Sequence, residues 1–132
     1  MTSVLNVDSI AAKDGTSPVE LTKQSAAKAW ISMVTETSNS VSDSFNIASN
    51  TDNGNGDFSI SFSNAFSNAH YATSGTASPG SSTNPYFLNP NRNGSDGLTV
   101  APTTSSQRFN TTVANAADDT DKVYVAEHGD LA

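Results

Sequence analysis

The sequence predicts an all-β protein, a small antiparallel β-sandwich of jelly-roll-like form, and three observations carry this prediction. Short runs of the chain alternate apolar and polar residues, as strands with one buried face do. Turn-forming residues separate these runs. About 50 of the 132 residues are Ser, Thr or Asn, which disfavour helix interiors and suit turns and the polar faces of strands. No stretch predicts a helix long enough for a parallel-strand crossover.

The first 26 residues are expected to form a separate N-terminal segment with a short hairpin. SVLNVDSI (3–10) alternates apolar and polar residues, KDGTS (13–17) contains an Asp-Gly turn, and PVELT (18–22) is a second short strand. Two strands alone are marginal in water, so this hairpin must pack on something. We assign 1–26 to anchoring or oligomerisation and 27–132 to the β-sandwich domain. The expected anchoring or packing residues are Leu5, Val7, Ile10, Val19, Leu21 and Trp30.

The next segments predict a brief helical turn near 23–27, a strand at 28–35 and a loop at 35–44. In the strand, Ala29, Ile31 and Met33 share one face, and Trp30 lies on the other. The alternative is one continuous helical face through Ala26, Trp30, Met33 and Val34. The strand is favoured for residues 28–35.

Residues 42–63 carry the clearest pattern of the chain, two strands around the turn TDNGNGD. Phe58, Ile60 and Phe62 share one face of the second strand, and Phe45 and Ile47 are expected to point the same way in the first. The turn lacks the ligand spacing of a helix-flanked calcium loop. Its two Asn-Gly pairs favour a plain hairpin turn, and an adventitious cation site is the weaker alternative.

The rest of the chain predicts four more strands and one long loop. Strands are expected at 69–78, 97–102, 106–116 and 121–129, and PGSSTNPYFLNPNRNGSDG (79–97) is expected to be the loop. In the last strand, Val123 and Val125 lie on the face opposite to Tyr124. Residues 28–132 therefore supply about six strands with turn signals between them, the pattern of a sandwich or barrel.

Composition excludes several classes of function and leaves the core thin. The net charge is −7 and the six basic residues are scattered, so neither nucleic-acid binding nor an anionic membrane surface is expected. The absence of cysteine excludes disulfides and thiolate chemistry. No signal peptide and no membrane-inserting segment are predicted. The hydrophobic fraction of 35% is low, and small scaffolds with thin cores often depend on oligomerisation.

No catalytic or cofactor-binding constellation is predicted. His70 and His128 each stand alone, and either would hold a metal only by meeting its own copies on a symmetry axis. The acidic run AADDTDK, with Asp118, Asp119 and Asp121, is predicted to be a solvated turn. In the long loop, aromatic rings and amides suit contact with sugars or proteins, although the rings could instead plug their own barrel end. The expected receptor contacts are Tyr86, Phe87, Asn89 and Arg92.

Two segments together resemble the phage tail-fibre and related virion structural proteins. LNVDSIAAKDGTSPVELTKQSAAKAW (5–30) is similar to their N-terminal strand, turn and strand, followed by Ala-Lys-Ala-Trp. DSFNIASNTDNGNGDFSISFSNAFSNAHYATSGTAS (43–78) is similar to the domain that follows. The resemblance covers somewhat more than half of the chain. It implies a non-enzymatic, usually homotrimeric protein on the virion, with an N-terminal segment that docks on the particle and a β-domain that projects outward.

The expected function is therefore that of a short trimeric tail fibre or receptor-binding adhesin, located on the virion at the tail or capsid surface. The alternative is a capsid cement or head-decoration protein, and a carbohydrate-active depolymerase is a minor alternative. The expected partners are further copies of the chain, other virion proteins, and a host-surface glycan or protein.

Overall fold

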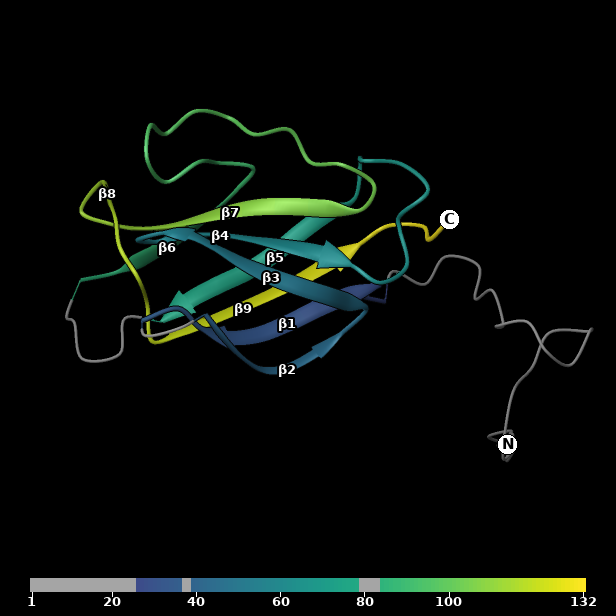
Figure 1. Cartoon of the computed structure of the whole chain (residues 1–132), viewed down its shortest axis with the longest axis horizontal. Coiled ribbons are helices and arrows are strands. Elements are labelled where there is room, and N and C mark those ends of the chain that lie inside the picture. The colour runs from purple at the N-terminus through teal and green to yellow at the C-terminus, as the bar shows by residue number, and fades with distance from the viewer. Residues whose placement is uncertain (1–25, 37–38, 79–83) are drawn as a thin grey trace, which may run out of the picture.

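Residues 26–36, 39–78 and 84–132, which the computed structural model describes, form a sandwich of two antiparallel sheets (Figure 1). Sheet A has the strand order β2-β1-β9-β5, and sheet B has the order β3-β4-β7-β6, with β8 paired to β7. The all-β antiparallel sandwich predicted from the sequence is thus confirmed, and the trimer stays a prediction. The strands are β1 (Ala29–Val34), β2 (Ser40–Phe45), β3 (Ile47–Gly54), β4 (Asp57–Phe62), β5 (Ala72–Ser78), β6 (Tyr86–Pro90), β7 (Ser106–Val113), β8 (Ala116–Ala117) and β9 (Lys122–His128).

Between β2 and β3 the chain crosses from sheet A to sheet B, and a single residue, Asn46, makes this crossing. Its φ of 58° lies in the left-handed region, which Asn tolerates better than most residues. The side chain ties neighbouring segments together. Its amide donates to the carbonyl oxygens of Lys28 (3.0 Å) and Asn64 (3.1 Å), and its Oδ1 accepts from Asn64 N (2.7 Å). These bonds fix the sharp crossing between the two layers.

Aromatic and aliphatic side chains from the inner faces of both sheets form the core. Phe58 of β4 and Phe109 of β7 are fully buried and stack with their ring centroids 5.3 Å apart, a geometry that adds about 1 kcal/mol to their burial. The other core residues are Ala29, Ile31, Met33, Ile60, Phe62, Phe66, Val123 and Val125. Polar side chains are buried among them, so the interior is mixed rather than wholly apolar.

Most strand predictions and their faces are confirmed. In β1, Ala29, Ile31 and Met33 are buried, as the alternation predicted. In β4, Phe58, Ile60 and Phe62 form the buried face. In β9, Val123 and Val125 are buried, while Tyr124 keeps 46% of its surface exposed.

Several predicted loops and boundaries were wrong. Residues 86–90 lie inside the expected loop of 79–97 but form β6, which pairs along β7. Residues 40–44 lie inside the expected loop of 35–44 but belong to β2, whose polar side chains stand at the open edge of sheet A. The expected strand at 97–102 contributes only an isolated bridge between Arg92 and Thr99. In these segments backbone pairing, which a polar sequence does not reveal, determines the structure.

Two further expectations have different outcomes. Phe45 and Ile47 do not share a face of one strand, because they end β2 and begin β3 in different sheets. No helical turn is present at residues 26–27, and residues 23–25 lie outside the described residues. The predicted N-terminal hairpin, with Leu5, Val7, Ile10, Val19 and Leu21, also lies outside them.

The Asn-Gly turn joins β3 to β4, as the sequence predicted, and adjoins the segment before β9. Asn55 Nδ2 donates to the Ala117 carbonyl oxygen (2.9 Å), and Gly56 N donates to Asp119 Oδ1 (2.7 Å). Gly56 has a φ of 63°, and a Cβ there would lie 2.4 Å from Asp118 N. Gly56 is therefore required for both its backbone conformation and its close packing.

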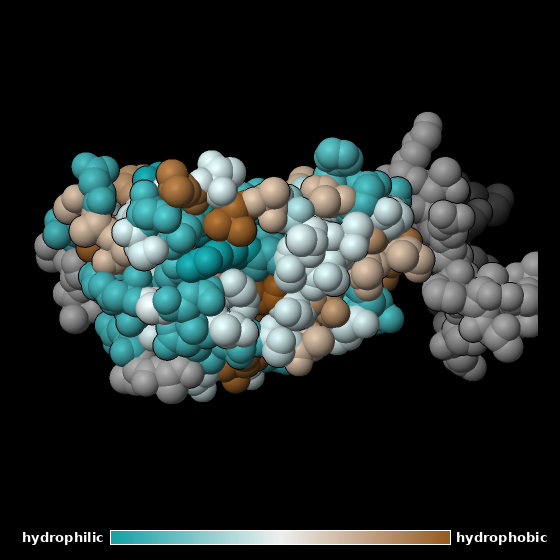
Figure 2. Space-filling view, turned by 45° about the horizontal axis from the view of Figure 1, so that its top comes forward, coloured by the Kyte–Doolittle hydropathy of each residue, from teal (hydrophilic) through white to brown (hydrophobic). Residues whose placement is uncertain are grey.

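Hydrogen bonds to an ion pair between β4 and β7 hold the segment between β6 and β7 against the outer face of sheet B: Gly94 N donates to Asp57, and Arg108 donates to Asn93 Oδ1 at 3.3 Å. Arg108 donates to both carboxylate oxygens of Asp57, at 2.8 and 2.6 Å, and Gly94 N donates to Asp57 Oδ2 at 2.7 Å. Burial by itself would raise the pKa of Asp57, but the bonds from Arg108 and Gly94 outweigh it and lower that pKa. Figure 1 shows this segment arching beyond β7. The face seen in Figure 2 is largely hydrophilic, with scattered hydrophobic residues.

We expect Gly56→Ala to lower the free energy of unfolding by at least about 2 kcal/mol, because strain at positive φ and a backbone clash combine. Gly54→Ala is the matched control. Gly54 also has a positive φ (129°), but a Cβ there has no atom within 4 Å, so only about 1 kcal/mol of strain is expected. Urea unfolding of both variants measures the difference, and equal losses would contradict the close packing at Gly56.

Candidate functional site

The outer face of sheet A is the candidate functional site, and strand alternation builds it. The residues between the buried positions of β1 and β9 point outward, which places Trp30 and Tyr124 on the same surface. Phe45 lies opposite Trp30 on the neighbouring strand β2 and is 52% exposed. We call this surface, with Phe45, Trp30 and Tyr124, the aromatic face.

Two cross-strand rows order the side chains of the aromatic face. Along the register, Trp30 lies opposite Phe45 on one side and Ala126 on the other, and Ala126 lies opposite Ser74. In the next row, Tyr124 lies between Ser32 and Thr76, and Ser32 lies opposite Asp43. The first row therefore combines two aromatic side chains with one hydroxyl group, and the second combines Tyr124 with two further hydroxyl groups and the Asp43 carboxylate.

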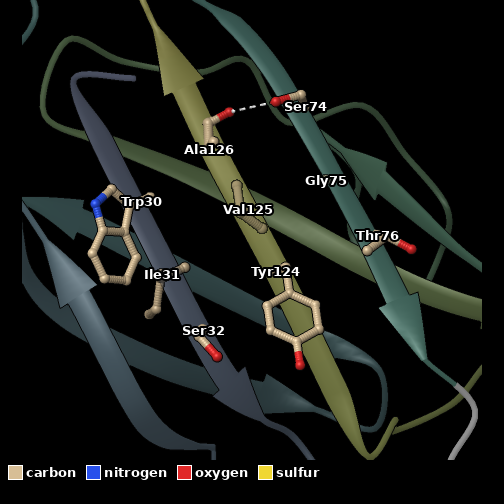
Figure 3. A pocket seen from close by; sticks show the side chains of 9 residues that line it. All are labelled: Trp30, Ile31, Ser32, Ser74, Gly75, Thr76, Tyr124, Val125 and Ala126. Carbon is tan, nitrogen blue, oxygen red and sulfur yellow. Dashed lines mark hydrogen bonds between the residues drawn. The ribbon is translucent and has the colours of Figure 1, made fainter. Parts of the chain in front are cut away.

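A shallow, open hollow of about 350 Å³ lies on this face across β1, β9 and β5. Figure 3 shows Trp30 and Tyr124 on its β1 and β9 sides and the hydroxyl groups of Ser32, Ser74 and Thr76 around it. Ile31 and Val125 lie at the floor of the hollow, and their side chains are buried in the core beneath it. Its lining is mainly apolar, with hydroxyl groups at intervals.

The chemistry of the hollow suits binding. Its lining residues carry hydroxyl, indole and phenol groups but neither carboxylate nor imidazole, so none of them is suited to act as a general base near neutral pH. Rings and hydroxyls of this kind hold a ligand by packing and hydrogen bonds. Trp30, expected from the sequence to be a packing residue of the anchor, lies half-buried on this face.

The four residues predicted to contact a receptor fall into two pairs, one hydrogen-bonded within the protein and one exposed on its surface. Tyr86 donates its hydroxyl to Asp118 Oδ2 (2.6 Å), which raises the pKa of Tyr86 to about 12. Asn89 donates to the Asn110 carbonyl oxygen (3.3 Å) and to Thr112 Oγ1 (3.1 Å). Both side chains thus make contacts within sheet B and its margin. Phe87, 60% exposed, and Arg92 remain available on the surface, and their receptor contact stays a prediction.

The other polar candidates take part in local structure. The Asp118 and Asp119 carboxylates accept from Tyr86 and Gly56, so this acidic run packs against the Asn-Gly turn. His70 is exposed, and its backbone N–H donates to Asn68. His128 Nε2 lies 3.5 Å from Ser74 Oγ. Within 26–36, 39–78 and 84–132, no three His, Cys, Asp or Glu residues gather as a metal site, and no helix could span a membrane.

A second cluster, which sequence reasoning missed, is buried between the sheets. Glu127 of β9 is fully buried, and its Oε2 accepts from Thr73 Oγ1 of β5 at 2.8 Å. Gln107 of β7 is 3% exposed and donates from Nε2 to Thr73 Oγ1 and to Asn91 Oδ1, both at 3.0 Å. The sequence did contain a signal for the burial of Glu127, because Val123, Val125 and Glu127 occupy every second position and therefore share the buried face of the strand.

Glu127 supplies the carboxyl group of this cluster, and its pKa is strongly perturbed. Burial raises the pKa of Glu127 to about 7, and the hydrogen bond from Thr73 only partly opposes this rise. Its second oxygen, Oε1, has no hydrogen-bond partner among the residues described. A buried carboxyl group with an unpartnered oxygen costs stability, and such a group calls for a functional explanation.

Comparisons with known proteins leave the family open: no family model matches the sequence, and no curated protein or solved structure matches the chain.

We expect Glu127 to make the protein less stable as the pH rises. Its pKa is higher in the folded than in the unfolded chain, so its favourable contribution is complete below about pH 4.5 and is lost as the pH rises to about 7. The loss amounts to roughly 3 kcal/mol. Glu127→Gln should remove this part of the pH dependence, measured by urea unfolding of both proteins across that range. Parallel stability curves would contradict the raised pKa.

Proposed function

We propose that this chain is a non-enzymatic virion surface protein, a short fibre or receptor-binding adhesin, whose β-sandwich binds a neutral glycan through the aromatic face. The observation that carries this proposal is the grouping of Phe45, Trp30 and Tyr124 on the outer face of sheet A, beside a hydroxyl-lined hollow. The resemblance of residues 5–30 and 43–78 to tail-fibre proteins supports the virion context.

The aromatic face matches the chemistry of a sugar. The apolar C–H face of a pyranose ring packs on indole and phenol rings, while its hydroxyls exchange hydrogen bonds with side-chain hydroxyls. Trp30 and Tyr124 supply the rings, and Ser32, Ser74 and Thr76 supply the hydroxyls. The net charge of −7 opposes a strongly anionic polymer, so the proposed ligand is neutral.

The proposed assembly is a homotrimer, and trimerisation would strengthen a shallow site. An open hollow binds a short ligand weakly, but three linked copies on a repetitive surface gain affinity through effective concentration. The thin core of the chain supports a need for neighbouring copies. The trimer itself comes from the resemblance.

The second candidate function is a capsid cement or head-decoration protein. An exposed sheet face with aromatic side chains also suits a protein partner, because aromatic residues are enriched in the centres of interfaces. In that case the aromatic face would contact a shell subunit. A particle reconstruction that locates the protein on the head favours cement, and a location on the tail favours the fibre.

A depolymerase is the weakest alternative. Asp118 and Asp119 accept hydrogen bonds that fix the local structure, and the hollow itself lacks the carboxylate pair that glycoside hydrolysis needs. New reducing ends after incubation of the purified protein with host polysaccharide would overturn the non-enzymatic proposal.

We expect Trp30→Ala and Tyr124→Ala each to weaken adsorption to host cells, and binding on a glycan array, at least about tenfold, because each removes an aromatic packing surface. Phe87→Ala is the matched control, since it removes an exposed ring from sheet B. If Phe87→Ala weakens binding and the two sheet A variants do not, the contact lies at the residues first predicted, Phe87 and Arg92. Circular dichroism confirms that each variant is folded.

We expect light scattering of the full chain to give three times the mass of one chain. The same measurement on Trp30→Ala tests whether the aromatic face holds the trimer together. A trimer that persists in this variant agrees with a ligand-binding role, whereas dissociation into monomers would assign the face to the subunit interface. A monomeric wild-type protein would contradict the proposed assembly.

A further inference from the structure

We propose that Thr73 and Gln107 form an intramolecular ester bond between the two sheets, with Glu127 as the general base. The inference rests on the buried cluster and is independent of the proposed function. Three groups that could carry out this reaction meet in the interior: a hydroxyl nucleophile, a carboxamide and a carboxyl group. They come from β5, β7 and β9.

The geometry places the nucleophile against the amide. Thr73 Oγ1 lies 3.0 Å from Nε2 and 3.3 Å from Oε1 of Gln107, so it faces the amide group whose carbonyl carbon lies between these two atoms. A hydroxyl held next to both outer atoms of the amide has a short path to the carbonyl carbon, which it must approach to about 3–3.5 Å for attack. Asn91 Oδ1 accepts from Gln107 Nε2 at 3.0 Å and holds the amide in this orientation.

The base is in contact with the nucleophile. A threonine hydroxyl has one proton, and the shortest of its contacts with these partners is the 2.8 Å bond to Glu127 Oε2. The hydroxyl therefore donates to the carboxylate, which is the arrangement for proton removal. A carboxyl group whose pKa lies near neutral pH is well matched to accept and return a proton.

The reaction balances without a co-reactant. Glu127 Oε2 takes the proton of Thr73 Oγ1, and this oxygen forms a bond to the side-chain carbonyl carbon of Gln107. The tetrahedral intermediate then loses the amide nitrogen, which takes the proton back from Glu127 and leaves as ammonia. No group is oxidised or reduced. The product is an ester between residues 73 and 107.

The surroundings favour survival of the product. Gln107 and Glu127 are 3% and 0% exposed and Thr73 is partly buried, so bulk water, which would hydrolyse an ester, has limited access to the ester carbonyl carbon. The bond would join β5 of sheet A to β7 of sheet B. A covalent link between the layers would supplement a core that contains few large apolar side chains.

The test is the intact mass of the full chain under denaturing conditions, followed by peptide mapping. After incubation of the folded protein at about pH 8, where Glu127 is ionised, we expect the mass to be lower by one ammonia, and the peptides that contain Thr73 and Gln107 to be linked. Thr73→Val should keep its full mass, and Thr73→Ser should still lose ammonia. Glu127→Gln should slow the loss at least about a hundredfold.

A matched control is present in the same protein. Thr112 Oγ1 accepts from the Asn89 amide at 3.1 Å, a similar pair of side chains in which no carboxylate bond to Thr112 is seen among the described contacts. Thr112→Val should therefore leave the ammonia loss unchanged. Asn-Gly pairs can also lose ammonia by cyclising, but that loss would persist in Thr73→Val and would map to the Asn-Gly peptides.

Two results would overturn the proposal. In the first, folded wild-type protein keeps its full mass after prolonged incubation at both pH 6 and about pH 8. In the second, ammonia is lost but the peptides with Thr73 and Gln107 remain separate. Treatment with hydroxylamine gives an additional check on a linked product, because it cleaves esters and should release the two peptides from one another.

Discussion

The main constraint on this fold is that two sheets must pack together with few large apolar side chains between them. Phe58 and Phe109 stack at the centre of the core, and the Phe62, Phe66 and Tyr71 rings pack near one end. Elsewhere the layers meet through hydrogen-bonded polar groups, among them Gln107 Nε2 of sheet B, which donates to Thr73 Oγ1 of sheet A at 3.0 Å. Buried polar groups of this kind must be satisfied to be tolerated, and they fix how the two sheets are placed.

The two outer faces of the sandwich differ in how much of them is covered. On sheet B, the segment between β6 and β7 covers Asp57 and Asn110, which are only 3% and 2% exposed although strand alternation points them outward. On sheet A, the described residues leave Trp30 and Tyr124 accessible beside the hollow. The proposed binding surface and the proposed ester therefore lie in different parts of the fold, one on its surface and one in its interior.

The sequence predicted the fold where hydrophobic alternation was strong and failed where pairing depends on the backbone. Phe58, Ile60 and Phe62 in β4 and Val123 and Val125 in β9 were placed correctly because apolar residues at every second position have one stable arrangement. β6 was missed, and β2 was predicted only in part, because their sequences, YFLNP and SVSDSF, lack that contrast. For the candidate site, Tyr124 was predicted to face away from Val123 and Val125, but its proximity to Trp30 depends on the pairing of β1 with β9, which is a long-range contact.

The covering of sheet B by its own connecting segment limits how copies of this chain could pack on one another. A sandwich with two bare faces can stack into a continuous column, since each copy offers a surface above and below. Here the segment between β6 and β7 covers part of one surface, held by bonds from Gly94 N to Asp57 and from Arg108 to Asn93, so the two faces of the molecule differ. Polarity of this kind favours closed clusters or a single outward-facing layer over open-ended fibrils.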